Sequence, residues 1–158
     1  VPHMRRKRHG RIINIGSVLG FLPMPFSALY SATKHAVAGY SESLDHELRT
    51  RGIRVSVIEP AYTRTKFDAN FLAADAMIDE YRDTRAALGK VLESVMASAD
   101  EPEVVAGVVL QAATDATPRL RYPAGGLANR LRLLRRFAPA RMVDAGIRKD
   151  LRLDRSVS

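Results

Sequence analysis

The chain has 158 residues, 46% of them hydrophobic, and a formal net charge of +8 at pH 7. This length suits one domain, and this composition allows a packed core and argues against wholesale disorder. The absence of cysteine excludes a disulfide framework and a thiolate metal site, and it is typical of a cytoplasmic protein. No apolar run approaches the roughly 20 residues of a membrane span, and the first residues do not resemble a signal peptide.

Much of the positive charge lies in two stretches, residues 5–8 and 130–136. Basic stretches of this kind occur in proteins that bind nucleic acid or anionic lipid. Neither stretch forms a basic face studded with aromatic residues, which nucleic-acid binding favours. We therefore interpret both stretches as solvated surface and expect no nucleic-acid partner.

The first half of the chain predicts an alternation of strands and a helix. A β-branched run predicts a buried strand over residues 11–15. Residues 17–27 contain glycine and proline and predict a loop, although an unusually apolar one. Residues 29–50 have the spacing of a helix that ends near Gly52, and residues 53–58 predict a second strand. The helix residues expected to face the core are Val37, Tyr40, Leu44 and Leu48.

The second half of the chain is mostly helical in pattern. We expect a largely helical stretch from about residue 67 to residue 97 with a break at Gly89, and a further helix that begins near Pro102. Alternating residues over 119–123 predict a third strand. Two short helices separated near Pro139 follow.

This order of elements predicts the fold class. Strands joined by helical crossovers form a parallel sheet with helices on its faces, because such crossovers are right-handed and pack back onto the sheet. We therefore expect an α/β fold with three parallel strands and flanking helices. The sequence contains no repeat, linker or low-complexity tract, so residues 1–158 are expected to form a single structural unit.

Polar side chains follow each of the first two predicted strands. Ser17 follows the first strand, Tyr30 and Lys34 lie at the start of the helix, and residues 60–65 follow the second strand. Ligands bind outside the carboxyl ends of parallel strands. We therefore expect these side chains to surround one crevice.

Tyr30 and Lys34 are four residues apart, so a helix places them on one face. Lowering the pKa of a phenol from about 10 to about 7 takes roughly 4 kcal/mol. A positive charge about 5 Å away supplies on the order of 3 kcal/mol at an effective dielectric near 20. We therefore expect Lys34 to lower the pKa of Tyr30, which then exchanges a proton near neutral pH, while Ser17 hydrogen-bonds the substrate oxygen. Taken alone, the pair has a simpler interpretation, a partly exposed ring beside a lysine.

Three segments resemble the active-site half of the short-chain dehydrogenases/reductases. They are GRIINIGSVLG, YSATK and IRVSVIEPAYTRT, which lie within residues 10–65. A looser resemblance extends to RLRYPAG, which is similar to the branch that includes steroid- and retinol-type dehydrogenases. The family resemblance implies the C-terminal half of a doubly wound, Rossmann-like parallel sheet and a nicotinamide cofactor, NAD or NADP.

The resemblance also implies roles for individual residues. Ser17 is the substrate-orienting serine, Tyr30 is the catalytic acid/base, and Lys34 lowers the pKa of the tyrosine and hydrogen-bonds the nicotinamide ribose. Besides Tyr30 and Lys34, the residues implied to contact the cofactor are Pro60, Ala61, Thr63 and Thr65. The residues implied to border the substrate are Val18, Met24 and Tyr62.

The resemblance begins partway through the family's pattern. The family starts with a strand and a Gly-rich turn that holds the cofactor pyrophosphate at a helix N-terminus, and an Asn-Ala-Gly segment follows; neither precedes Gly10. We therefore interpret residues 1–158 as a partial domain that lacks the dinucleotide-binding half and is inactive alone. The strand at 11–15 then has a bare apolar edge, which predicts marginal stability or self-association.

The sequence thus predicts an oxidoreductase that transfers hydride between a nicotinamide cofactor and a carbonyl or secondary alcohol of an apolar small molecule, with Tyr30 as acid/base. We expect a homo-oligomer in the full-length form. The alternative is a truncated, non-catalytic fragment or interaction module that retains half of the fold.

Other features allow two interpretations. The apolar loop at 18–26 is either a substrate wall or a cover for the core. Residues 127–137 mix apolar and basic side chains at helical spacing, which indicates either a helix packed on the domain or peripheral contact with an anionic membrane surface. The four histidines lack metal-ligand spacing, so we expect no metal site. The residues that form either a substrate lid or ordinary packing are Phe67, Phe71, Leu72 and Met77.

Overall fold

Three parallel strands form one sheet in the computed structural model, which describes residues 1–65, 76 and 78–153. The strands are β1 (Gly10–Ile15), β2 (Ile53–Pro60) and β3 (Arg121–Ala124). The helices are α1 (Pro2–Lys7), α2 (Ala28–Arg49), α3 (Arg82–Ala97), α4 (Pro102–Thr114), α5 (Gly126–Phe137) and α6 (Ala140–Asp150), with short 3₁₀ turns η1 (Val18–Gly20) and η3 (Asp79–Tyr81). The predicted α/β fold with three parallel strands is confirmed.

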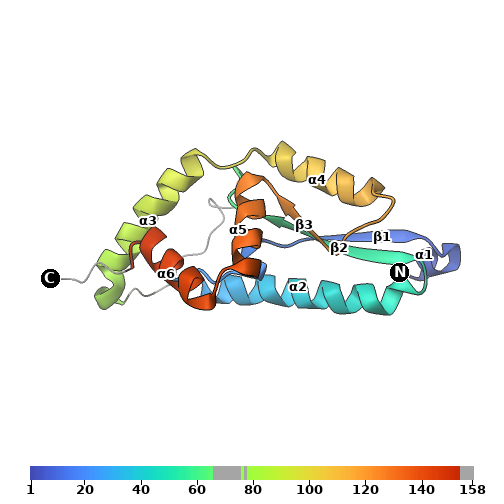
Figure 1. Ribbon diagram of the computed structural model, residues 1–158, viewed down its shortest axis with the longest axis horizontal. Coiled ribbons are helices and arrows are strands. Elements are labelled where there is room, and N and C mark those ends of the chain that lie inside the picture. The colour runs from blue at the N-terminus through green and yellow to red at the C-terminus, as the bar shows by residue number, and fades with distance from the viewer. Residues whose placement is uncertain (66–75, 77, 154–158) are drawn as a thin grey trace.

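Strand β2 lies in the middle of the sheet, with β1 on one side and β3 on the other. Ile15 at the end of β1 is opposite Ile58 of β2, and Tyr122 of β3 is opposite the same residue on the other side. Helix α2 packs against one face of the sheet and α4 against the opposite face (Figure 1). This layering follows from the strand–helix–strand order of the sequence.

Each face of the sheet has its own apolar cluster, because alternate side chains of a strand point to opposite faces. The cluster under α4 consists of Ile58, Ala112, Tyr122 and Ala124. The cluster under α2 consists of Leu48, Ile53 and Val55. Within the described residues β1 pairs only with β2, and its terminal Ile15 is 49% exposed. The predicted strand over 11–15 is therefore confirmed, but it is half-buried rather than buried.

The face of α2 that meets the sheet is largely small and polar. Tyr40, which we predicted to face the core, is 62% exposed, so that prediction is wrong. Leu48 is buried as predicted, and Val37 and Leu44 are half-buried. The buried residues of α2 are Ser31, Ala38, Ser41, Asp45 and Leu48. They recur at intervals of three, four or seven, which is the spacing of one helix face, so apolar spacing alone identified only part of it.

Two glycines that we predicted to end or break helices differ in outcome. Gly52 follows α2 with φ +74°, and a Cβ there would collide with the carbonyl oxygen of Arg8, so this turn requires glycine. Gly89 lies inside α3, which runs unbroken from Arg82 to Ala97, so the predicted break is wrong. A glycine inside a helix costs only about 1 kcal/mol.

The predicted lid residues, Phe67, Phe71, Leu72 and Met77, lie outside the described residues.

Asp45 is a fully buried carboxylate that connects α2 to β2. Its Oδ1 accepts hydrogen bonds from the backbone N–H of Val55 at 2.8 Å and from Nε of Arg54 at 2.9 Å, and its Oδ2 accepts one from Nε of Arg49 at 3.1 Å. Burial alone raises the pKa of Asp45, but these hydrogen bonds outweigh it and lower the pKa to about 2. The carboxylate is therefore charged and compensated inside the fold.

Glu59 is a second fully buried carboxylate, at the carboxyl end of β2. Its oxygens pair with Arg121 of β3 at 2.5 Å and with Arg132 of α5 at 2.6 Å. Arg121 also donates through Nε to Glu42 of α2 at 2.7 Å. This network joins two strands and two helices directly before Pro60, where the predicted cofactor loop begins.

We predict that the Asp45 carboxylate stabilises the fold in a pH-dependent way. Its pKa is lower in the folded chain than in the unfolded chain, so its contribution of about 2 kcal/mol is complete above about pH 4 and is lost as the pH falls from 4 to 2. The substitution Asp45→Asn should lower the free energy of unfolding in urea at pH 7 by about 3 kcal/mol. The difference between wild type and variant should shrink at about pH 2.5.

The matched control is Glu47→Gln, because Glu47 lies on the same helix and is exposed. We expect this substitution to change the free energy of unfolding by less than about 0.5 kcal/mol. An equal loss in both variants, or a loss in Asp45→Asn that does not depend on pH, would contradict the assigned role.

Candidate active site

The carboxyl ends of β1 and β2 lie side by side and carry the predicted site residues. The backbone N–H of Gly16 donates to the carbonyl oxygen of Ile58 at 2.8 Å. A Cβ on Gly16 would lie 2.6 Å from Cγ1 of Val57, so the absence of a side chain permits this approach. The chain therefore leaves β1 directly beside the last residues of β2.

Ser17 is buried at this strand end and begins the η1 turn. Its Oγ accepts a hydrogen bond from the backbone N–H of Leu19 at 3.1 Å, which is the bond that a serine makes when it caps a helical turn. The Ser17 side chain is also hydrogen-bonded to the hydroxyl of Tyr30. The turn thus holds the serine hydroxyl against the phenol.

Tyr30 and Lys34 lie in the first turns of α2, and both are half-buried. The Lys34 Nζ donates to the carbonyl oxygen of Ile15 at 3.2 Å and lies 5.5 Å from the centroid of the Tyr30 ring. The structure therefore brings Ser17, Tyr30 and Lys34 together at the end of β1, as the sequence predicted.

The electrostatic environment of Tyr30 differs from our prediction. Burial raises the pKa of Tyr30 above its ordinary value of 10.0, and the hydrogen bond with Ser17 lowers it only in part. Burial also lowers the pKa of Lys34. The predicted net lowering of the Tyr30 pKa is therefore wrong, because burial of the phenol outweighs the favourable hydrogen bond.

The loop after β2 is held by a segment distant in sequence. Thr63 forms a parallel bridge with Asp100. The Asp100 N–H donates to the carbonyl oxygen of Tyr62 at 3.1 Å, and the Arg64 N–H donates to the carbonyl oxygen of Asp100 at 2.9 Å. Arg64 also pairs with Glu101 at 2.8 Å. No local sequence pattern indicated this pairing of Asp100 with the loop.

The other predicted contact residues lie around the same two strand ends. Pro60 ends β2, Ala61 is half-buried, and Thr65 is exposed. Of the three residues predicted to border the substrate, Val18 is only 6% exposed, whereas Met24 and Tyr62 are half-buried. Burial raises the pKa of Tyr62. Val18 therefore contributes mainly to the core beside the site.

Glu59 is the residue that sequence reasoning missed near this site. It is the single charged residue after Arg54 in the otherwise apolar or small run IRVSVIEP. A carboxylate in such a run is buried only with a partner, so its position in the run was the signal from which Glu59 could have been found.

In the described part of the chain, no group of three or more acidic or histidine side chains is arranged to hold a metal, and no helix is long and apolar enough to cross a membrane.

Comparisons with known proteins identify the family. Residues 1–76 match the family model described as short chain dehydrogenase. An uncharacterized oxidoreductase of Schizosaccharomyces pombe is 38% identical over 124 residues, covering 78% of this chain and 52% of the relative. A 3-ketodihydrosphingosine reductase of Bacteroides thetaiotaomicron is 30% identical over 129 residues, covering 80% of this chain and 48% of the relative.

A solved structure agrees in fold. The crystal structure of a short-chain dehydrogenase from Streptomyces avermitilis matches with a TM-score of 0.69 at 24% identity, over 99% of this chain and 55% of that one. This likeness concerns the fold; the family model and the Schizosaccharomyces pombe relative show that the chain belongs to the short-chain dehydrogenase/reductase family. It spans about half the length of the curated relatives that it matches.

We predict that Tyr30 ionises above pH 10 in this chain and that Ser17→Ala raises its pKa further, because the serine hydrogen bond favours the phenolate. The measurement is the ¹³Cζ chemical shift of labelled tyrosine against pH, with Tyr30→Phe used to assign the resonance. A Tyr30 pKa below the ordinary value of 10.0, or a decrease in Ser17→Ala, would show that the environment of Tyr30 is misassigned.

Proposed function

We propose that this chain is the active-site half of an NAD- or NADP-dependent oxidoreductase that interconverts a carbonyl and a secondary alcohol of an apolar small molecule. The convergence of Ser17, Tyr30 and Lys34 at the end of β1 carries this proposal. These three groups derive from two separate segments of the chain, and the fold joins them at the edge of the sheet where ligands bind.

The residues at this edge fit the nicotinamide end of the proposed cofactor. Half-exposed Ile15 offers an apolar surface at the end of β1, and Lys34 offers ammonium protons beside it. An apolar surface next to hydroxyl and ammonium groups suits a nicotinamide ring and its ribose. We assign Tyr30 and Lys34, together with Pro60, Ala61, Thr63 and Thr65, to cofactor contacts; when bound, the nicotinamide supplies or accepts the hydride.

In the proposed reduction, the Tyr30 hydroxyl donates its proton to the carbonyl oxygen of the substrate. The raised pKa of Tyr30 keeps the phenol protonated at neutral pH, which is the state that a general acid requires. Ser17 holds the same oxygen by a hydrogen bond. In the reverse direction, Tyr30 accepts the proton of the alcohol, and the Lys34 ammonium beside the ring favours the phenolate form that this step requires.

Met24 and Tyr62 are the proposed substrate contacts, with Val18 behind them. The similarity to a 3-ketodihydrosphingosine reductase, whose name describes a ketone on a lipid chain, supports an apolar substrate.

Membership of the steroid- and retinol-type branch and a homo-oligomeric full-length form stay predictions, as does a cytoplasmic location. The alternative is a non-catalytic module that keeps half of the fold, and turnover by an assembled enzyme distinguishes the two.

We predict that Tyr30→Phe removes turnover without removing cofactor binding. The assay uses a chimera in which residues 1–158 replace the matching part of the Schizosaccharomyces pombe oxidoreductase, with NADH or NADPH oxidation followed on a panel of apolar ketones and aldehydes. Loss of the proton donor should lower kcat by about 10²–10⁴-fold. Cofactor affinity should change less than about threefold, because the ring remains in place.

The matched control is Tyr40→Phe in the same chimera, since Tyr40 lies on α2 but is exposed. This variant should keep wild-type turnover. A chimera that binds cofactor but turns over no substrate in the panel would favour the non-catalytic alternative, and equal turnover in both phenylalanine variants would refute the role of Tyr30.

We also predict that the 158-residue chain alone binds NADH and NADPH weakly. Its proposed contacts serve the nicotinamide end, whereas the pyrophosphate of such cofactors is typically held at a Gly-rich helix N-terminus. Titration of nicotinamide fluorescence should give no saturation in the micromolar range. Saturable micromolar binding would show that this chain contains a complete cofactor site.

A further inference from the structure

The outward face of α5 combines exposed apolar side chains with arginines. Leu133, Leu134 and Phe137 are 59%, 47% and 73% exposed, although the same helix buries Ala128 completely. Met142 of the neighbouring α6 is 59% exposed as well. The exposed basic residues of α5 are Arg130, Arg135 and Arg136. Apolar side chains gathered at a surface in this way mark an interaction site.

Helical spacing places Leu133, Leu134 and Phe137 on one face of α5 together with Arg130, whereas Arg135 lies on the other side of the helix. Leu133 and Phe137 are one turn apart, and so are Arg130 and Leu134. Basic and apolar side chains thus alternate across the part of α5 that the domain leaves uncovered. This is the pattern of helices that lie in the interface of an anionic bilayer, where arginines reach the headgroups and apolar side chains enter the acyl boundary.

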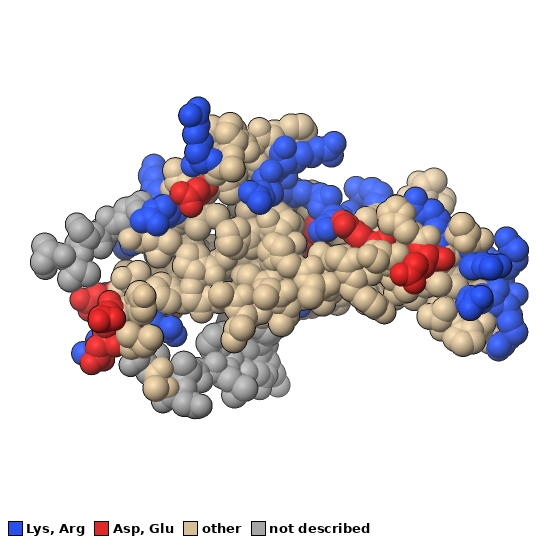
Figure 2. All heavy atoms as spheres, turned by 90° about the horizontal axis from the view of Figure 1, so that it is seen from below, with Lys and Arg blue, Asp and Glu red and all other residues tan. Residues whose placement is uncertain are grey.

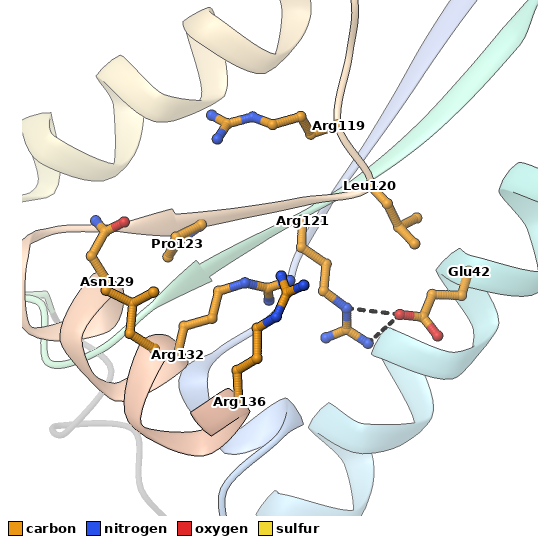
Figure 3. A pocket seen from close by; sticks show the side chains of 9 residues that line it. Glu42, Arg119, Leu120, Arg121, Pro123, Asn129, Arg132 and Arg136 are labelled. Atoms are coloured by element: carbon orange, nitrogen blue, oxygen red, sulfur yellow. Dashed lines mark hydrogen bonds and ion pairs between the residues drawn. The ribbon is translucent and has the colours of Figure 1, made fainter. Parts of the chain in front are cut away.

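A hollow of about 470 Å³ opens beside this face, between α2, β3 and α5 (Figure 3). Figure 3 shows the guanidinium groups of Arg132 and Arg136 close together beside Arg121, whereas Arg119 extends away from them. Leu133 also lines the hollow. The apolar face and the basic hollow are therefore continuous on the same helix.

The carboxylates at the hollow compensate only part of its positive charge. Arg121 pairs with Glu42 and Glu59, and Arg132 pairs with Glu59. Arg136 has no carboxylate partner among the residues that the structure describes, and its guanidinium lies 5.4 Å from the centroid of the Phe137 ring. Three guanidinium groups thus meet two carboxylates. Guanidinium groups bind phosphate oxygens through paired hydrogen bonds, so the unbalanced charge suits a phosphate group.

We propose that α5 and the adjoining hollow form a docking surface for a bilayer that contains anionic phospholipid. Leu133, Leu134 and Phe137 enter the interface, while Arg136 and Arg132 contact lipid phosphate. A free phosphate ion would leave the apolar side chains in water, and an uncharged apolar surface would leave Arg136 unbalanced. An anionic lipid provides acyl chains for the apolar side chains and a phosphate for Arg136. None of the candidate catalytic residues belongs to this surface.

The first experiment uses a tryptophan reporter, because the chain contains no tryptophan. In Phe137→Trp, emission should shift to the blue when vesicles of phosphatidylcholine and phosphatidylserine are added, and brominated lipid should quench it. Leu110→Trp is the matched control, since Leu110 is 65% exposed on α4, away from the proposed surface. Its emission should stay unchanged. A shift in neither variant, or an equal shift in both, would overturn the proposal.

The second experiment separates this surface from simple electrostatic attraction. Lys and Arg side chains also gather at the end of the molecule that carries α1 (Figure 2), where Arg5 and Arg6 are exposed. In co-sedimentation with the same vesicles, Leu133→Ser combined with Phe137→Ser should lower the bound fraction about tenfold without changing the charge. Arg136→Gln should lower it several-fold, and Arg5→Gln combined with Arg6→Gln should lower it less.

Three results would contradict the membrane interpretation. Equal pelleting of wild type and the double serine variant would assign binding to charge alone. Loss of vesicle binding on addition of millimolar inorganic phosphate would assign the hollow to a free ion. The wild-type chain could instead fail to bind vesicles and self-associate, while the double serine variant is monomeric. That result would assign the face to a second copy of the chain.

Discussion

The parallel pairing of β1 with β2 is the constraint on which the candidate site depends. Because the two strands run in the same direction and in register, their carboxyl ends stop at one edge, and the N–H of Gly16 reaches the carbonyl of Ile58. Ser17 and the loop that follows Pro60 are adjacent for this reason. Helix α2 begins at this same edge, so its first turns place Tyr30 and Lys34 there.

Two buried carboxylates hold the elements around this pairing. Asp45 accepts hydrogen bonds from the backbone and from one side chain of β2, and Glu59 pairs with arginines of β3 and α5. A buried charge is tolerated only when opposite charge and donors compensate it. Both carboxylates meet this condition, but the arginines around Glu59 exceed the available acids, and the excess faces the surface at Arg136. The network that fixes the end of β2 thereby produces the basic hollow beside α5.

Local sequence patterns predicted the elements well and the burial of individual residues less well. The β-branched runs and the glycine and proline positions are local properties of the sequence. They were therefore sufficient to predict the three strands and the helix after Gly125. Tyr40 was wrongly placed in the core because the face of α2 that packs on the sheet is small and polar rather than apolar. Which face packs depends on the surface of the sheet, and the sequence of the helix alone does not show it. The unbroken α3 shows the same limit, since packing decides whether Gly89 ends a helix.

By itself, the sequence determined the α/β class, the family and the grouping of Ser17, Tyr30 and Lys34. Element order and the handedness of crossovers are sufficient for the fold class, whereas the family followed from the resemblance of residues 10–65 to the short-chain dehydrogenases/reductases. Only the tertiary structure decided the direction of the Tyr30 pKa, the pairing of Asp100 with the loop after β2, and the compensation of Glu59. Each depends on burial or on partners far away in the sequence, and the free energy of a charge is set by those surroundings rather than by its neighbours along the chain.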